Sequence, residues 1–218
     1  MIKPFVGVIF FMALAGAMHL PAKCLALFGY QFIPGVYVGG FAGYSGGVDM
    51  DCKPVKTNRG IYAGIKGGIE FLSLFRIEEE LAWQGNDVTS LHGGILQVGH
   101  ASGYLNIWSL MSNVLLDFPF NCCLPARPYI GGGIGGAYAD GHWWAKIHEG
   151  GLYIGNEFGD NHRIVRSGIH EGGFAWQVIA GLNFPFCYGI TVGIEYRYFN
   201  TIHRLSSHKF GAVLSKSF

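Results

Sequence analysis

Apolar and polar side chains alternate along most of this chain. Between residues 61 and 71, Ile65 and Ile69 fall on one face of an extended segment, and Lys66 and Glu70 fall on the other. Because successive side chains of a strand point to opposite faces, this period of two predicts strands with one apolar and one polar face. Eight such segments follow one another: 36–44, 61–71, 75–84, 104–117, 127–138, 174–184, 190–199 and 210–218.

The connections between these segments alternate in length. Short links follow the second, fourth and sixth segments, whereas long polar segments follow the others, among them Ser45–Arg59, Gly85–Gly103 and Ala139–Gly172. Segments of about ten residues are long enough to cross hydrocarbon as tilted strands. The pattern predicts an all-β fold, an eight-stranded antiparallel up-and-down transmembrane β-barrel with four long outer loops and short periplasmic turns.

The last segment, 210–218, places Phe210, Leu214 and Phe218 on its apolar face. In lipid every backbone N–H and C=O group needs a partner, and a sheet meets this need only when its last strand pairs with its first. We therefore interpret 210–218 as the closing strand, with both ends of the barrel on the periplasmic side.

The composition agrees with a transmembrane β-barrel, because apolar residues are abundant but dispersed along the chain. Half of the residues are hydrophobic and only 13% are charged, yet no segment beyond the N-terminal region approaches the roughly 20 apolar residues of a membrane helix. The 35 glycines disfavour helix throughout. A net charge of +1 without a Lys/Arg cluster predicts no nucleic-acid partner.

The N-terminal segment, residues 1–26, is typical of a cleavable signal peptide. Lys3 supplies the positive end, Phe5–Ala17 supplies the apolar core, and small residues allow cleavage after Ala26 or after Ala17. The core is too short to span a bilayer as a helix. Residues 27–218 then form the barrel domain of a protein exported to the bacterial outer membrane.

Five segments resemble successive strands of a known family. These are 75–83, 109–119, 128–135, 174–177 and 195–200, and together with the terminal Phe218 they are similar to the opacity-protein and OmpA-like eight-stranded surface antigens. The resemblance implies a small outer-membrane barrel that contacts lipid and displays variable loops, often as an adhesin or surface antigen that binds host surface molecules. It also implies that Phe218 is the signal read by the outer-membrane assembly machinery.

The polar face of the predicted strands would line the barrel interior. It carries Lys66, Glu70, Arg76, Glu78, Glu80, Asn113, Asp117, Gln177, Asn183, Glu195 and Arg197. An eight-stranded barrel has room inside for side chains but hardly for a channel, and isolated charges there are costly. We therefore expect a network of ion pairs and hydrogen bonds that leaves no open pore, rather than an ion path or a Glu78–Glu80 acid/base pair.

Glu79 breaks this pattern. In the same register it faces lipid, which is tolerable near the interface or where a bulge shifts the strand.

The third long loop is the chemically richest segment. Its candidate interaction residues are His142, Trp143, Trp144, His148 and His170. The pairs His148–Glu149 and His170–Glu171 offer zinc ligands, but their spacing matches no compact site, so no metal or other cofactor is predicted. The alternative is a solvated loop with both Trp residues at the headgroup level.

Two other functions compete with surface display. A lipid-modifying outer-membrane enzyme needs a nucleophile with a His and an acid, and the residues near the last hairpin offer Ser206, Ser207, His203, His208 and Glu195. They match no lipase signature, and no Gly-x-Ser-x-Gly elbow occurs. A soluble ligand-binding barrel requires an apolar interior, whereas here the charged face is the inner one. We therefore predict a non-enzymatic, monomeric or weakly associated barrel that acts as a surface antigen or adhesin, or as an envelope-structural protein.

The cysteines are typical of an exported protein. Cys122, Cys123 and Cys187 fall in turns at the periplasmic rim, where disulfides persist. Adjacent cysteines bridge each other poorly, so a bond from Cys122 or Cys123 to Cys187, or to an envelope partner, competes with free thiols. Cys52 lies apart in the first outer loop.

Overall fold

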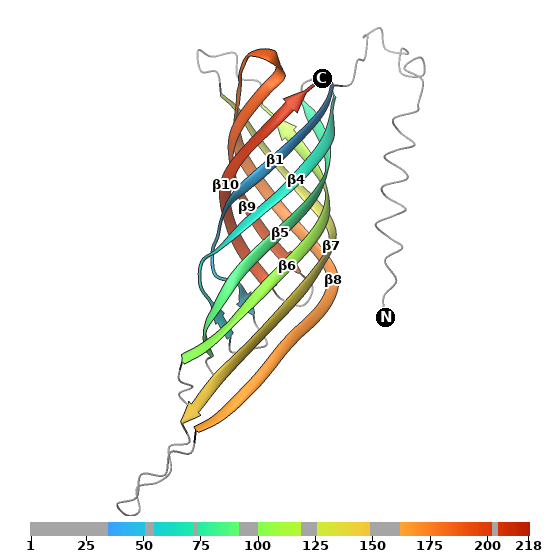
Figure 1. Ribbon diagram of the computed structural model, residues 1–218. Coiled ribbons are helices and arrows are strands. Elements are labelled where there is room, and N and C mark those ends of the chain that lie inside the picture. The colour runs from blue at the N-terminus through green and yellow to red at the C-terminus, as the bar shows by residue number, and fades with distance from the viewer. Residues whose placement is uncertain are drawn as a thin grey trace, which may run out of the picture.

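The computed structural model describes residues 35–50, 55–71, 74–91, 100–118, 126–148, 162–201 and 205–218. Nearly all of them lie in strands (Figure 1). Among these residues, no helix has the length and apolar character needed to cross a membrane. The predicted signal peptide lies outside the described residues, as do Cys52, Cys122 and Cys123.

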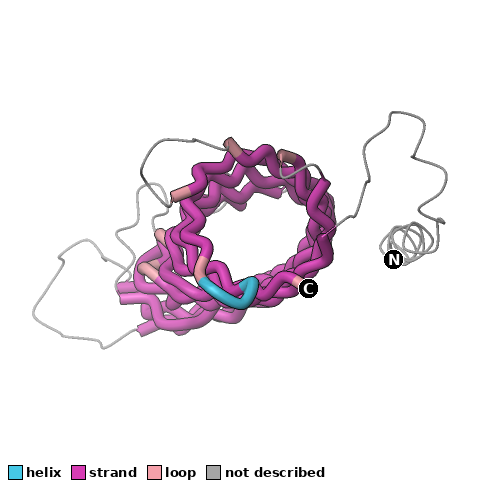
Figure 2. Tube along the Cα trace, turned by 90° about the horizontal axis from the view of Figure 1, so that it is seen from above, coloured by secondary structure: helices cyan, strands magenta, loops and turns pink. Residues whose placement is uncertain are grey.

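Eight long strands form a closed antiparallel barrel. They are β1 (Gly35–Ser45), β4 (Gly60–Phe71), β5 (Phe75–Leu91), β6 (His100–Asp117), β7 (Arg127–His148), β8 (His162–Pro185), β9 (Ile190–Thr201) and β10 (Leu205–Ser217). Each pairs with the next, and β10 pairs with β1, so that the trace forms a ring when viewed along its axis (Figure 2). The short strands β2 (Asp49–Met50) and β3 (Val55–Thr57) pair with β10 and β5. The eight-stranded barrel predicted from the sequence is confirmed.

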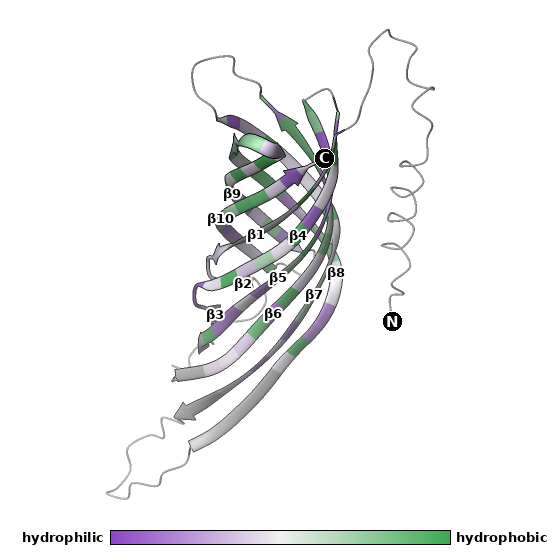
Figure 3. Cartoon of the chain, turned by 45° about the horizontal axis from the view of Figure 1, so that its top comes forward, coloured by the Kyte–Doolittle hydropathy of each residue, from purple (hydrophilic) through white to green (hydrophobic). Residues whose placement is uncertain are grey.

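The alternation of side chains determines what each face of the sheet meets. Along β5, Arg76, Glu78 and Glu80 are buried in the interior, whereas Phe75 and Leu81 are exposed on the outside. Hydrophilic and hydrophobic residues are interspersed along the strands (Figure 3). Large apolar and aromatic side chains of all eight strands are exposed on the outside, so the outer surface suits hydrocarbon.

The strands continue further than the sequence pattern indicated. Most of the expected loop Ala139–Gly172 is a paired hairpin, because β7 runs to His148 and β8 begins at His162 (Figure 1). β9 and β10 are likewise separated only by residues 202–204. Polar and glycine residues in these extensions hide the alternation, since outside hydrocarbon the outward positions need not be apolar.

The opposite end of the barrel has short connections. Between β8 and β9 the chain reverses through a 3₁₀ helix, η3 (Cys187–Gly189), in which Tyr188 has φ 62° and Gly189 has φ 72°. The Cys187 thiol is free and exposed. Its predicted disulfide partners, Cys122 and Cys123, lie outside the described residues. This short-turn end also holds Phe218, whose N–H donates to the carbonyl of Val36.

Glycines on the inner face of β7 allow a close approach to β6. A Cβ on Gly135 would lie 2.9 Å from the Cα of Met111 and would also collide with the carbonyl oxygen of Leu110. On the outer face, a Cβ on Gly136 would meet only the carbonyl oxygen of Gly173, at 3.8 Å. The inner glycines thus leave space for the bulky inward side chains of β6.

This contrast gives a paired test of the packing. We expect Gly135→Val to lower the stability of the barrel by several kcal/mol, because overpacking against backbone atoms forces strands apart. Gly136→Val, one residue away on the outer face, should change it by less than about 1 kcal/mol. Urea unfolding in detergent, followed by tryptophan fluorescence, measures both values, and equal losses would contradict the inner placement of Gly135.

Candidate functional site

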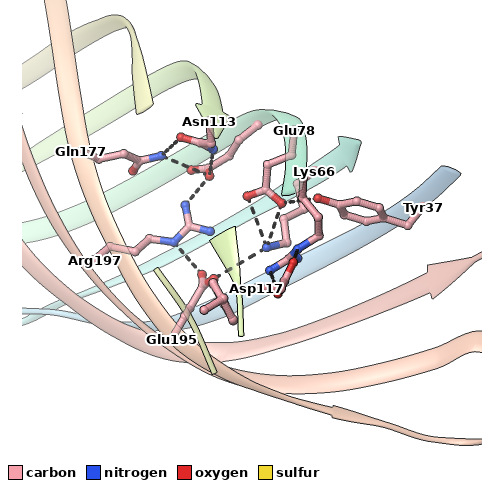
Figure 4. A network of polar contacts seen from close by, with 11 residues as sticks. Tyr37, Lys66, Glu78, Asn113, Asp117, Gln177, Glu195 and Arg197 are labelled. Carbon is pink, nitrogen blue, oxygen red and sulfur yellow. Dashed lines mark hydrogen bonds and ion pairs between the residues drawn. The ribbon is translucent and has the colours of Figure 1, made fainter. Parts of the chain in front are cut away.

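Buried charges meet in the middle of the barrel (Figure 4). Lys66 of β4 is the first bridge between strands. Its Nζ lies 3.3 Å from Oε2 of Glu78 on β5 and 3.7 Å from Oε2 of Glu195 on β9. These three side chains are almost fully shielded from solvent. The ion pairs therefore span the lumen between strands that are distant in the sequence.

Arg197 of β9 forms the second bridge. Its Nε donates to Oε1 of Glu195 at 2.6 Å, and its Nη1 forms an ion pair with Glu80. The guanidinium carbon lies 4.2 Å from the centre of the Phe41 ring, within the range of a cation–π contact. The planar group is thus held between two carboxylates and an aromatic face.

Neutral side chains satisfy further carboxylate oxygens. Asn113 Nδ2 donates to Oε2 of Glu80 at 3.1 Å, and Gln177 Nε2 donates to Oδ1 of Asn113 at 2.8 Å. Tyr37 donates its hydroxyl to Glu78 at 2.8 Å, and Tyr129 does the same to Glu195 at 3.0 Å. A buried carboxylate is tolerated only with such partners.

A separate pair lies nearer the short-turn end. Arg76 donates from Nε to Oδ2 of Asp117 at 2.6 Å and from Nη2 to Oδ1 at 3.0 Å, a two-point contact. Glu70 and Asn183, also expected inside, are only partly buried. Together with Arg76 and Asp117 they line a cavity of about 50 Å³ at this end.

The buried ionisable groups balance in formal charge. Among the described residues, four basic side chains (Lys66, Arg76, Arg197, Lys209) face four acidic ones (Glu78, Glu80, Asp117, Glu195), so their formal charges sum to zero. Sequence reasoning had not assigned Lys209 to the interior. Its Nζ lies 4.2 Å from the centre of the Phe199 ring, within the range of a cation–π contact. The alternation of side chains indicates this position, because Lys209 precedes Gly211 and Val213 by two and four residues and lies on the same face of β10.

The interior is not polar throughout, which corrects the expectation from the sequence. Towards the long-hairpin end, buried apolar side chains form a continuous cluster. Its members are Val48, Val88, Leu105, Ile107, Met111, Ala139, Trp143, Ile169, Ala175, Phe199 and Leu205. Where the strands extend beyond hydrocarbon, their outer face meets water and their inner face is shielded from it. Apolar side chains are therefore buried on the inner face. The polar network is thereby covered on its outer side.

Glu79 faces outward in the unshifted register. It stands opposite Ser112 of β6, whose hydroxyl donates to its Oε1 at 2.7 Å. The structure therefore needs no bulge at this position, because a cross-strand hydrogen bond partly satisfies the carboxylate.

The candidate residues of the third hairpin separate onto two faces. His142, Trp144 and His170 are exposed on the outside, whereas Trp143 is 4% exposed and belongs to the inner cluster. The expectation that Trp143 is an interaction residue at the surface is wrong, because the period of two continues through this segment. The side chain of His148 lies outside the described residues. Asp140, which sequence reasoning missed, stands directly opposite His170.

The residues considered for nucleophilic catalysis also lie on different faces. Glu195 and Ser207 are buried inside, and Ser207 donates to Gln84 at 3.3 Å. His208 lies outside, with its Nδ1 2.6 Å from the hydroxyl of Tyr196. The sheet therefore separates the acid from the histidine, and His203 lies outside the described residues.

A closed eight-stranded barrel with an apolar outer surface and a charged interior is the architecture of a small outer-membrane protein. The model of the outer membrane protein beta-barrel domain family matches residues 9–218. The chain belongs to this family, and its location is the bacterial outer membrane.

Comparison with solved structures finds similar barrels. Neisserial surface protein A has a TM-score of 0.50 at 13% identity, over 84% of this chain and 97% of that one. The attachment invasion locus protein of Yersinia pestis, Ail, has a TM-score of 0.46 at 12% identity, over 84% of this chain and 97% of that one. A search of curated protein sequences gives no match. At 13% identity, the likeness to Neisserial surface protein A shows a shared fold and nothing more.

The short-turn end is therefore the periplasmic end, and the long hairpins are on the outer side. Exposed aromatic residues form rows across adjacent strands on the outer side of the apolar surface. Tyr44 pairs with Phe210, which pairs with Tyr196, and Trp108 pairs with Tyr138. Such rows mark the level of the lipid headgroups.

The network gives a second prediction. Arg197→Met leaves Glu80 and Glu195 without their main cation, so we expect a loss of about 3–5 kcal/mol in the free energy of unfolding. The control is Lys216→Met at the periplasmic rim, where an exposed cation contributes less than about 1 kcal/mol. Urea unfolding in detergent compares the two, and an unchanged Arg197→Met barrel would contradict the bridging role of Arg197.

Proposed function

We propose that this protein is a surface-displayed barrel, acting as a surface antigen or adhesin through its outer hairpins, with the transmembrane part serving as a scaffold without an open pore. The observation that carries the proposal is the length of the third hairpin. β7 has 22 residues and β8 has 24, whereas β4 and β9 have 12 each.

A strand needs only about ten residues to cross the membrane. The additional pairs of β7 and β8 extend past the ends of the other strands, as Figure 1 shows, and therefore beyond the part of the barrel that crosses hydrocarbon. Main-chain pairing makes this projection an ordered extension of the sheet, and binding residues are commonly carried on such rigidly supported segments. The name of Neisserial surface protein A, whose structure shares the fold, agrees with a role at the cell surface.

The filled interior supports a scaffold rather than a channel. Ion pairs occupy the middle of the lumen, and the apolar cluster covers them on the outer side. The separation of His208 from Glu195 gives no support to lipid-modifying catalysis.

Partners follow from the surfaces. Membrane lipid contacts the apolar exterior, and host surface molecules would contact the outer hairpins. The exposed thiol of Cys187 at the periplasmic rim is accessible to an envelope partner. Phe218, which is 81% exposed at the same rim, is available to the assembly machinery.

Shortening the third hairpin tests the display function. Removal of the whole segment Ala139–Gly172 would delete Trp143 and Ile169 from the inner cluster and so damage the fold. Replacing only residues 145–165 by a short Gly/Ser turn spares these side chains. We expect the shortened barrel to remain heat-modifiable on gels while adhesion to host cells, or recognition by antibodies against intact cells, falls at least tenfold.

The matched control replaces residues 92–99 between β5 and β6 by the same turn. Full adhesion and full antibody recognition after the 145–165 replacement would refute the assignment of display to the third hairpin.

The role of Phe218 in assembly can be separated from general effects of charge at the periplasmic rim. We expect Phe218→Asp to lower the amount of protein in the outer membrane several-fold. Phe186→Asp places the same charge on another exposed rim phenylalanine, 61% exposed in the β8–β9 turn, and should leave the level near that of the parent. Quantitative blots of outer-membrane fractions measure both, and equal levels would count against Phe218 as the signal.

A further inference from the structure

Three side chains with metal-binding groups meet on the outer surface of the third hairpin. They are Asp140 and His142 of β7 and His170 of β8, and one ligand atom from each lies within 4.8 Å of the others. Nδ1 of His170 is 2.7 Å from Oδ1 of Asp140, and the rings of His142 and His170 are 4.8 Å apart between centres.

The register of the sheet produces this meeting. Asp140 and His170 are direct cross-strand partners, and His142 is two residues further along the same face of β7. Side chains at positions i and i+2 of one strand and at the facing position of its neighbour share one side of a sheet at short range. The sequence conceals the arrangement, because 27 residues lie between His142 and His170. Pairing of β7 with β8 is required to bring them together.

A glycine opposite His142 shapes the cluster. Gly168 is the cross-strand partner of His142, and a Cβ placed on it would lie 3.0 Å from Nδ1 of His142. The imidazole thus occupies the space that a side chain at 168 would fill, and it leans towards His170. On its other side, the Tyr104 ring packs edge-on against it at 5.8 Å, at an interplanar angle of 68°.

One carboxylate oxygen of Asp140 has no hydrogen-bond donor among the described residues. This oxygen, Oδ1, is shielded from solvent, and Nδ1 of His170, 2.7 Å away, forms an ion pair with it only when that imidazole is protonated. A shielded carboxylate oxygen without a donor is unfavourable. A cation shared with His170 would satisfy this oxygen and both imidazoles.

We propose that Asp140, His142 and His170 form a binding site for a divalent transition-metal ion of the zinc class. Imidazole nitrogen and carboxylate oxygen are ligands that Zn²⁺ takes at about 2.0–2.2 Å. Tetrahedral donors at these lengths stand roughly 3–4 Å apart, so small rotations of the three side chains suffice. Three protein ligands leave one position open to solvent.

The position of the site makes it accessible. Asp140 and His142 follow Tyr138, a member of the outer aromatic row, by two and four residues on the same face of β7. The site thus lies just beyond hydrocarbon on the outer surface, where dissolved metal reaches it without crossing the barrel. His170 and Asp140 keep 53% and 35% of their side-chain surface exposed.

Calorimetry on the folded full-length protein in detergent, stripped with a chelator and titrated with zinc chloride, tests the site. We expect one equivalent of Zn²⁺ to bind, and Co²⁺ in its place to give the visible absorption bands of a low-symmetry, near-tetrahedral site. Asp140→Asn, His142→Ala and His170→Ala should each abolish this one-to-one binding while the barrel stays heat-modifiable.

Gly168→Ala is the sharper variant because it removes no ligand. By displacing the His142 ring, it should weaken Zn²⁺ binding on the order of 10–100-fold, the scale for disturbing a ligand's support. Gly172→Ala, on the same face of β8, is its control, since a Cβ there meets Tyr138 at an ordinary 3.5 Å. His208→Ala controls for an unrelated exposed histidine, and both controls should bind like the parent.

Two results would overturn the proposal. One is the absence of saturable Zn²⁺ binding by the parent protein. The other is unchanged stoichiometry and affinity in a His142→Ala/His170→Ala double variant, which would assign the binding to other histidines of the chain. Either result leaves the display function untouched, because that function is measured by adhesion and antibody recognition.

Discussion

Closure of the sheet is the constraint on which the rest of this molecule depends. In lipid, the backbone N–H and C=O groups of every strand must pair, and a barrel pairs them all by joining β10 to β1. Closure gives the sheet an inner and an outer face, so every second side chain of each strand points into a narrow lumen. The apolar exterior, the buried ion pairs and the close approach at the β7 glycines are consequences of this geometry.

Two kinds of packing fill the interior. In the middle of the barrel, charges are paired across the lumen and supplied with neutral donors such as Asn113 and Tyr37. Towards the outer end, an apolar cluster lies beside the hydrogen-bonded side chains of Ser45, Gln84 and Asn86. Large apolar side chains are buried there because the exterior of the projecting strands faces water rather than hydrocarbon.

The sequence allowed the fold to be predicted because period-two alternation is strong wherever one face meets hydrocarbon. The same alternation places Lys66, Glu78 and Arg197 on the inner side, but it does not specify that Lys66 bridges Glu78 and Glu195, since this depends on the curvature of a closed sheet. In sequence, the extensions of β7 and β8 are typical of a loop because both of their faces mix polar, glycine and aromatic residues. For the same reason the sequence alone does not predict that Trp143 lies inside the barrel or that Asp140 meets His170.

The balance of buried charges has a consequence for how the barrel is completed. The buried inner charges of β4, β5 and β6 comprise two cations (Lys66, Arg76) and three carboxylates (Glu78, Glu80, Asp117), a sum of −1. β9 adds one charge of each sign, and among the described residues Lys209 of β10 brings the formal sum to zero. A chain whose last strand has slipped by two residues keeps its apolar face outward but moves this lysine away from its buried position. The position of Lys209 therefore differs between the native seam and registers that hydrophobicity alone would accept.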